Sequence, residues 1–160
     1  MVRRLFQIRE KEIRKMETTC IFCDGKLEKY FIKKFEYWNV YLCEDQNYLG
    51  RTYIALNRHG PETIQELTNE EWIEFRDVID KVSKVLHNLY KYDFINYLVL
   101  QNNDRNHFHI QLIPRYIEAR IVYGEEFKDE RWGHSPFPAD KKEFSEKLLL
   151  KIKEDIKKEL

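Results

Sequence analysis

The sequence predicts an α+β fold in which an antiparallel sheet carries helices on one side. Two observations predict it. One long segment in the middle of the chain has the apolar spacing of an amphipathic helix, and short apolar runs before and after it have the length of strands. Most connections are too short for the crossovers that parallel strands need. Because 160 residues suffice for one core, we expect a single domain over residues 1–160.

Composition and charge exclude several classes of protein. Apolar residues make up 42% of the chain, a share typical of globular domains rather than of disordered chains. The 28 basic residues balance 28 acidic ones, which argues against the binding of long nucleic acid. No apolar run approaches the roughly 20 residues of a membrane span. Three cysteines do not suggest a disulfide framework. We therefore expect a cytoplasmic protein without a membrane partner.

The first half of the chain contains an expected helix and two expected strands. Residues 1–19 form an N-terminal extension, with apolar residues at an imperfect helical spacing over 3–18. The segment Cys20-Ile21-Phe22-Cys23-Asp24-Gly25 is typical of a tight turn. The apolar runs 35–43 and 51–57 flank a break that contains a glycine, and we expect a hairpin or meander there.

The clearest helix follows. Thr68 and Glu71 have the spacing of a capping box, in which each side chain accepts a backbone N–H of the first helical turn. Beyond them, apolar residues recur at three- and four-residue steps and form one face about five turns long. These residues are Trp72, Phe75, Ile79, Val82, Leu86 and Leu89. Asp93-Phe94 ends the helix.

Two further strands, 95–101 and 107–114, are joined by the polar loop 102–106. Glycines and prolines mark loops in the last third of the chain, and a charged helix is expected in residues 141–160.

The strand at 107–114 carries the residues best suited to chemistry. Side chains two apart share one face of a strand, so His107, His109 and Gln111 line up roughly 6.5 Å apart per pair. The apolar residues between them point into a core. A polar row on a rigid element suits a catalytic site, and we expect room beside His109 for an esterified phosphate. The alternative is a half-exposed strand that happens to carry two histidines.

Two cysteines and two histidines have the spacing of a metal site. Cys20 and Cys23 form a Cys-x-x-Cys turn, and together with His59 and His107 they make a complete tetrahedral set for zinc. The alternatives are a redox pair or small buried apolar residues. A redox pair usually belongs to a thioredoxin-like βαβ unit, which this sequence does not predict.

Four separated motifs give the chain a resemblance. They are Cys20-Ile21-Phe22-Cys23, Asn57-Arg58-His59, the helix start at 67–71, and His107-Phe108-His109-Ile110-Gln111-Leu112-Ile113-Pro114-Arg115-Tyr116. In these motifs and in their order the chain resembles the histidine-triad (HIT) superfamily over about residues 20–133. The resemblance implies an antiparallel sheet of about five strands with a long helix packed on it. It also implies a homodimer.

The resemblance further implies roles for the motif residues. His109 is the nucleophile, which takes a nucleotidyl group onto one ring nitrogen while the other donates to a backbone carbonyl. Several bacterial members and galactose-1-phosphate uridylyltransferase hold zinc with two cysteines and two histidines. That pattern falls on Cys20, Cys23, His59 and His107, which predicts a structural zinc with no open position. His107 would then fix the strand that directs His109 toward its substrate.

Gln111 departs from the hydrolase pattern, which has a third histidine there. Transferases and phosphorylases of the superfamily, including diadenosine tetraphosphate phosphorylases, carry glutamine. A neutral amide can hydrogen-bond a phosphoryl oxygen without a titrating proton. One hypothesis is that the nucleotidyl-His109 intermediate passes to phosphate or another acceptor more readily than to water. The alternative is an ordinary hydrolase with a tolerated substitution.

The remaining candidates for substrate contacts lie in loops. Asn103 matches an asparagine that contacts phosphate or ribose in relatives, although asparagine is also a common turn former. Asp45 and Gln46 occupy the loop where relatives bind the ribose hydroxyls. Arg115 could face phosphate, but we expect it at the surface. The segment Trp132-Gly133 is similar to one that folds over the pocket in some relatives.

Three other residues are expected to have no role in the site. His87 should be solvated, His134 should lie in a surface loop, and Cys43 should pack at a strand end.

Taken together, the residues and the resemblance predict an enzyme that breaks a nucleoside phosphate at the α-phosphorus through His109. It would be a hydrolase, nucleotidyltransferase or phosphorylase that acts on dinucleoside polyphosphates or nucleoside phosphate derivatives. The alternatives are a nucleotide-binding regulatory protein with slow turnover, or a nucleic-acid end-processing protein. The zero net charge and the absence of a basic stripe disfavour the last.

Overall fold

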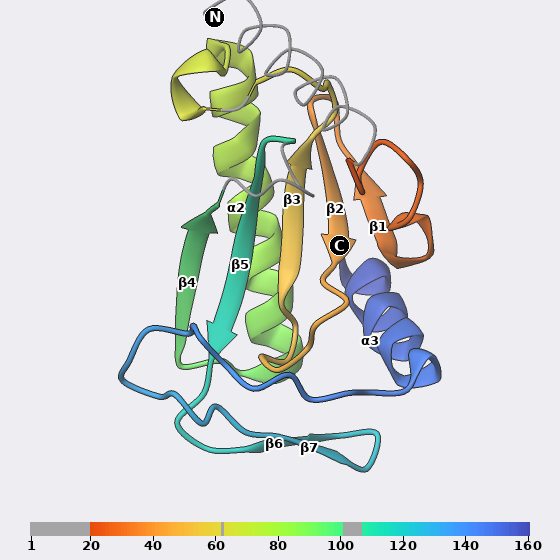
Figure 1. Ribbon diagram of the computed structural model, residues 1–160, viewed down its shortest axis with the longest axis vertical. Helices are drawn as coiled ribbons and strands as arrows, with labels where there is room; N and C mark the ends of the chain where they lie inside the picture. Colours follow the sequence, from red (N-terminus) through yellow and green to blue (C-terminus); the bar gives the residue numbers. More distant parts are fainter. Residues whose placement is uncertain (1–19, 62, 101–106) are drawn as a thin grey trace, which may run out of the picture.

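A five-stranded antiparallel sheet forms the centre of the computed structural model, which describes residues 20–61, 63–100 and 107–160 (Figure 1). The strand order is β1-β2-β3-β5-β4, and every neighbouring pair is antiparallel. The α+β fold class and the five-stranded antiparallel sheet are therefore confirmed. The strands are β1 (Phe31–Lys34), β2 (Trp38–Leu42), β3 (Thr52–Leu56), β4 (Phe94–Val99) and β5 (His109–Arg115).

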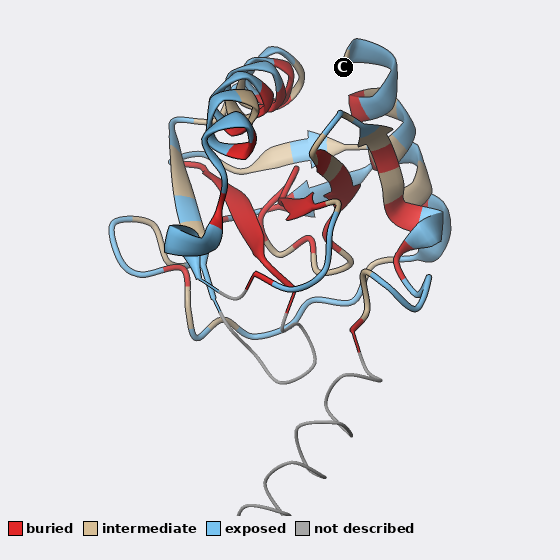
Figure 2. Ribbon diagram, turned by 90° about the horizontal axis from the view of Figure 1, so that it is seen from above, coloured by how far each residue is buried: buried red, intermediate tan, exposed pale blue. Residues whose placement is uncertain are grey.

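Both long helices lie on one side of the sheet (Figure 2). Helix α2 (Asn69–Tyr90) begins with the expected capping box, in which the Thr68 hydroxyl accepts the Glu71 N–H and the Glu71 carboxylate accepts the Thr68 N–H. Helix α3 (Glu146–Glu159) is capped by Ser145 and packs beside β1 and β2. Two short 3₁₀ helices, η1 (Glu28–Tyr30) and η2 (Ile64–Glu66), complete the helical segments of the described chain.

Several element boundaries differ from the expectation. Strand β1 was not expected, and the run that was expected to begin at residue 35 becomes a strand only at Trp38. The Glu74 carboxylate accepts the N–H groups of Glu36 and Tyr37, which holds residues 35–37 in a turn. Helix α3 begins later than expected because Ser145 caps it. The expected helix over 1–19 and the residue Asn103 lie outside the described residues.

The expected apolar stripe of α2 is wrong at its first turn. Trp72 is 38% exposed, whereas Glu71, Phe75 and Val78 are buried. Trp38 of β2 lies beneath this turn and donates its indole N–H to the Glu71 carbonyl. Because this contact places Glu71 over the sheet, the next residue, Trp72, points away from it.

The two faces of the sheet have different chemistry. Ile110 and Leu112 of β5 pair with Ile54 and Thr52 of β3 and pack beneath the helices. His109 and Gln111 pair with Ala55 and Tyr53 and therefore point to the opposite face. The alternation along β5 thus places the apolar residues in the core and the polar row on the face that the helices leave open.

The segment after β5 lies at the end of the sheet opposite residues 20–25, which we call the cysteine turn (Figure 1). A small hairpin, β6 (Arg120–Val122) and β7 (Glu125–Phe127), is followed by a long loop. This loop is held near β3, because the Tyr48 hydroxyl donates to the Pro136 carbonyl and Asn47 bonds the backbone of Asp140.

No helix in the described part of the chain combines the length and the apolar character that a bilayer crossing demands.

Gly50 occupies a position that only glycine fits, directly before Arg51. Its φ of +79° lies in the left-handed region, and an added Cβ would lie 3.0 Å from both the Leu86 side chain and the Tyr90 ring. We expect Gly50→Ala to lower the free energy of unfolding by about 2–4 kcal/mol, the sum of backbone strain and overpacking. Gly124→Ala, with φ +84° in open space, should cost only about 1–2 kcal/mol. Equal losses in urea unfolding would contradict the close packing at Gly50.

Candidate active site and metal centre

The four predicted metal ligands meet at one end of the sheet. The N–H groups of Cys23 and Asp24 both donate to the Cys20 carbonyl, which closes the tight turn and brings the two thiols together. His59 follows β3 and His107 precedes β5, so two neighbouring strands supply the imidazoles. The ligand atoms of Cys20, Cys23, His59 and His107 all lie within 4.8 Å of one another.

The distances in this cluster fit a tetrahedral ion. Zinc bonds of about 2.3 Å to sulfur and about 2.0 Å to nitrogen place two nitrogens about 3.3 Å apart and a sulfur about 3.5 Å from a nitrogen. The Nδ1 atoms of His59 and His107 are 3.3 Å apart, and Cys23 Sγ lies 3.3 and 3.4 Å from them. His107 Nε2 bonds the Leu56 carbonyl, which leaves the lone pair on Nδ1, toward the cluster.

The protonation states also suit a metal ligand set. Burial lowers the pKa of His107, which keeps its imidazole neutral. The pKa of Cys23 is raised to about 12, mainly by desolvation and then by the hydrogen bond to Cys20 and the charge of Cys20. Without a cation the Cys23 thiol would therefore keep its proton at neutral pH, and a bound cation would displace that proton.

His109 lies two residues beyond this cluster, on the same face of β5. Its Nδ1 lies 2.7 Å from the His107 carbonyl oxygen, a distance at which a ring N–H donates. In the neutral ring the lone pair is then on Nε2, the tautomer that a nucleophilic imidazole needs.

The His109 ring is covered, whereas we expected it to have open space beside it. It is 1% exposed. The centroids of the Phe22 and Tyr53 rings lie 5.1 and 5.7 Å from that of His109. The cover arises because Phe22 belongs to the cysteine turn, which lies over the strand. Phe22 itself is half-buried.

Gln111 lies beside a buried cation, Arg51, that was not among the expected site residues. Nε and Nη2 of Arg51 donate to Gln111 Oε1 at 3.1 and 2.6 Å, and Nη1 donates to Asp45 Oδ2 at 2.8 Å. The Phe137 ring stacks on the guanidinium, with its centroid 4.9 Å from Cζ. The Arg51 side chain is only 7% exposed. The structure therefore adds Arg51 to the candidate residues and shows that it links Asp45 to Gln111.

Gln46 has a different environment from Asp45. It is fully buried, and its amide nitrogen donates to the carbonyls of Cys43 and Arg51, while its oxygen accepts the Gly50 N–H. Both ends of the Gln46 amide are thus hydrogen-bonded within the loop. These contacts do not support the expectation that Gln46 binds a ribose.

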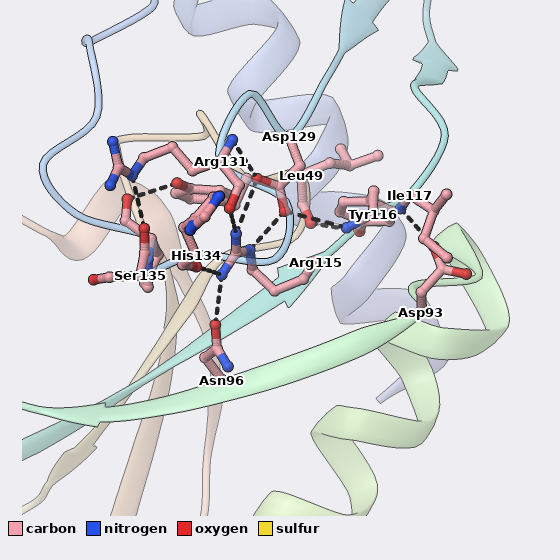
Figure 3. A network of polar contacts seen from close by, with 12 residues as sticks. Leu49, Asp93, Asn96, Arg115, Tyr116, Ile117, Asp129, Arg131, His134 and Ser135 are labelled. Atoms are coloured by element: carbon pink, nitrogen blue, oxygen red, sulfur yellow. Dashed lines mark hydrogen bonds and ion pairs between the residues drawn. The ribbon is translucent and has the colours of Figure 1, made fainter.

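The expectation that Arg115 lies at the surface is wrong. Its guanidinium is buried, and its five N–H groups bond Asp129, Asn96 and the carbonyls of Arg131 and His134 (Figure 3). Asp129 lies fourteen residues downstream, so no local pattern in the sequence indicates this burial. Arg115 fastens the loop after β7 to β4 and β5, and its donors are all engaged by the protein.

The other residues weighed from the sequence lie mostly as expected. His87 is exposed on α2, His134 is exposed in a loop, and Cys43 is fully buried directly after β2. Trp132 stacks on Phe94, with ring centroids 5.1 Å apart.

An aromatic group that was not expected lies beside His109. Phe22 packs against Tyr41 and Tyr53, with centroids 5.7 and 5.6 Å apart. The signal was the two-residue alternation in β2 and β3, which places Tyr41 and Tyr53 on the face of His109.

Solved structures of histidine triad proteins share this architecture. One from Sinorhizobium meliloti has a TM-score of 0.68 at 18% identity, over 91% of this chain and 99% of that one. A zinc-bound family member from Mycobacterium smegmatis has a TM-score of 0.53 at 15% identity, covering 88% and 96%. A diadenosine triphosphate hydrolase from Plasmodium falciparum has 0.58 at 13%, covering 82% and 76%. No family model and no curated protein matches the chain. At these identities the likeness establishes the fold, and the histidine-triad fold implied by the motifs is confirmed.

Removing Asp129 should destabilise the protein strongly. Asp129→Ala leaves the buried Arg115 charge without its carboxylate, and we expect a loss of about 3–5 kcal/mol in the free energy of urea unfolding. Glu130→Ala removes an exposed partner of Lys128 and should change stability by less than about 1 kcal/mol. The double replacement of Arg115 by Met and Asp129 by Leu should recover part of the loss. Similar effects of Asp129→Ala and Glu130→Ala would contradict the anchoring role.

Proposed function

We propose that this chain belongs to the histidine-triad superfamily and cleaves a nucleotide at its α-phosphorus through a covalent nucleotidyl-His109 intermediate. The observation that carries the proposal is the hydrogen bond from His109 Nδ1 to the His107 carbonyl. It fixes the ring on a rigid central strand and assigns the lone pair to Nε2. A residue chosen only for packing would not need this tautomer.

The surroundings of His109 support a nucleotide as substrate. Phe22, Tyr41 and Tyr53 form an aromatic group beside the imidazole, and aromatic rings stack on nucleobases. Asp45 is partly exposed at the other end of the row and could bind a hydroxyl group. The likeness to a diadenosine triphosphate hydrolase adds support for dinucleoside polyphosphates or nucleoside phosphate derivatives as the substrate class.

In the proposed reaction His109 Nε2 attacks the α-phosphorus. A P–N bond forms as the P–O bond to the leaving group breaks, and the leaving oxygen takes the electron pair and then a proton from solvent. An acceptor oxygen next attacks phosphorus, the P–N bond breaks, and the acceptor proton goes to solvent. Gln111 contributes an amide N–H to a phosphoryl oxygen, where negative charge accumulates.

The molecule that takes the nucleotidyl group from His109 distinguishes a phosphorylase, which uses phosphate, from a hydrolase, which uses water. Gln111 is neutral at every pH and brings no titrating proton beside the intermediate. We propose that phosphate or another anion accepts the nucleotidyl group more readily than water does, and hydrolysis is the competing outcome.

Product analysis tests both statements. With diadenosine tetraphosphate as probe, we expect ADP formation to rise with added phosphate and to exceed AMP formation. His109→Ala should lose at least about 1,000-fold in kcat, because the nucleophile is gone, while nucleotide binding persists. His87→Ala, on the exposed side of α2, is the control and should match the wild type. Equal AMP formation with and without phosphate would leave a hydrolase, and activity in His109→Ala would refute the nucleophile.

A second candidate function is a nucleotide-binding regulator with slow turnover. The burial of His109 under Phe22 favours it, because a closed ring reacts slowly. Radiolabelled substrate separates the two functions, since label trapped on the protein favours chemistry and binding without trapping favours the regulator.

We also propose a structural zinc at Cys20, Cys23, His59 and His107. The near-tetrahedral distances and the backbone partner of His107 support it, as does the likeness to a zinc-bound family member. Four protein ligands complete the coordination of zinc, so the ion would hold His107 and the start of β5 rather than activate water. The three free thiols suit a reducing compartment such as the cytoplasm.

Loss of one ligand should release the metal. Cys20→Ser should reduce bound zinc from about one ion per chain to near zero and lower the thermal midpoint by several degrees, since metal binding adds to folding free energy. Cys43→Ala replaces a buried cysteine outside the cluster and should retain zinc. Elemental analysis and thermal unfolding measure both effects. A wild-type protein that folds stably without zinc would refute the structural role.

A homodimer through β4 completes the proposal. This strand is an edge of the sheet. Its Phe94, Tyr97 and Val99 side chains are exposed, which is typical of a surface that a second copy covers.

A further inference from the structure

We propose that Arg51 is a positioning residue. It fixes the orientation of the Gln111 amide, so that the NH₂ group of this amide, and not its carbonyl oxygen, is presented to the phosphoryl group on His109. This inference rests on the function proposed above, because it gives Arg51 a role within that same site.

The contacts of Arg51 determine which end of the amide is free. A guanidinium carries donors only, so the group that it contacts at 3.1 and 2.6 Å must be the oxygen of Gln111. Two charge-assisted bonds occupy both lone pairs of this oxygen. The NH₂ group is at the other end of the planar amide, and no described residue accepts a hydrogen bond from it. The amide is thus oriented as a donor before any substrate binds.

Arg51 is itself held in place from several directions. Asp45 accepts from Nη1, the Phe137 ring stacks on the guanidinium, and the Gln46 amide bonds the Arg51 backbone carbonyl. The burial of the side chain excludes most of the water that would otherwise compete for its donors. The orientation of Gln111 is therefore set by a rigid group whose own position does not depend on the substrate.

This orientation matters because the two ends of an amide have opposite polarity. A carbonyl oxygen directed at a phosphoryl oxygen repels it, whereas an N–H donor stabilises the negative charge that grows there. The positive charge of Arg51 also polarises the amide and strengthens its N–H as a donor. Without Arg51 the side chain could rotate and present either end, and part of the protein would hold Gln111 in the repulsive orientation.

The competing explanation is that Arg51 only joins the 44–50 loop to the sheet through Asp45. The two explanations differ in how mutations combine. A residue that acts through Gln111 has no effect once the amide is gone, whereas a purely structural residue keeps its full effect.

A double-mutant cycle with the full-length protein makes this comparison. We expect Arg51→Met and Gln111→Met each to lower kcat by about 10–100-fold, with KM for the dinucleotide changed less than about threefold. The double variant should be no slower than Gln111→Met alone. Gln111→Glu, which accepts from Arg51 but cannot donate, should lose at least as much as Gln111→Met. Arg120→Met, which removes a guanidinium from the β6 strand, is the control and should retain kcat within about twofold. Multiplicative losses in the double variant would overturn the proposal.

A ligand-free measurement separates this proposal from the proposed function. In ¹H–¹⁵N spectra the side-chain NH₂ signal of Gln111, identified by its loss in Gln111→Met, should be dispersed in the wild type. In Arg51→Met it should collapse toward the position of a freely rotating amide, while the backbone signals of β3 and β5 are retained. An unchanged signal in Arg51→Met overturns the positioning role. A wild type that turns over no nucleotide refutes the proposed function, and this spectral comparison still decides whether Arg51 orients the amide.

Discussion

The alternation of side chains along β5 is the constraint on which the rest of the site depends. Ile110 and Leu112 pack beneath the helices, and this packing fixes the register of the strand against β3. A slip of one residue would bury His109 in the apolar core and expose the apolar row, so the register is strongly determined. The polar row of His107, His109 and Gln111 is therefore a direct consequence of burying the residues between them.

Each member of this row is then held by a different partner. The Leu56 carbonyl orients His107, the His107 carbonyl orients His109, and Arg51 orients Gln111. Two of these partners are backbone carbonyls, one at the last residue of β3 and the other two residues before β5, so both are held close to the sheet. The cysteine turn adds a link of another kind, because its Phe22 covers His109 while its thiols face His107. The same short segment thus contacts both the candidate nucleophile and the candidate metal ligands.

Local patterns predicted much of this arrangement, and non-local contacts account for what they missed. The capping box at Thr68, the alternation of β5 and the four candidate metal ligands could be identified because each of these residues belongs to a short motif. Strand β1 is a four-residue edge strand with two lysines, so it carries little apolar signal. The burial of Arg115 and Arg51 depends on Asp129 and on Gln111, residues that no spacing rule connects to them. The cover over His109 likewise depends on a turn more than eighty residues away in the sequence.

Arg51 explains why glutamine suits position 111, where hydrolases of the superfamily have a third histidine. A buried guanidinium has only donors, so its neighbour must offer an acceptor, and a protonated imidazole there would place two positive charges in contact. Histidine could stay beside Arg51 only in its neutral form. Glutamine accepts from Arg51 with its oxygen and donates with its nitrogen at every pH. The two residues are therefore best regarded as one unit, in which the cation supplies fixed positive charge and, in the proposed reaction, the amide offers a neutral donor to the phosphate. A glutamine without the arginine would lack both the orientation and the charge.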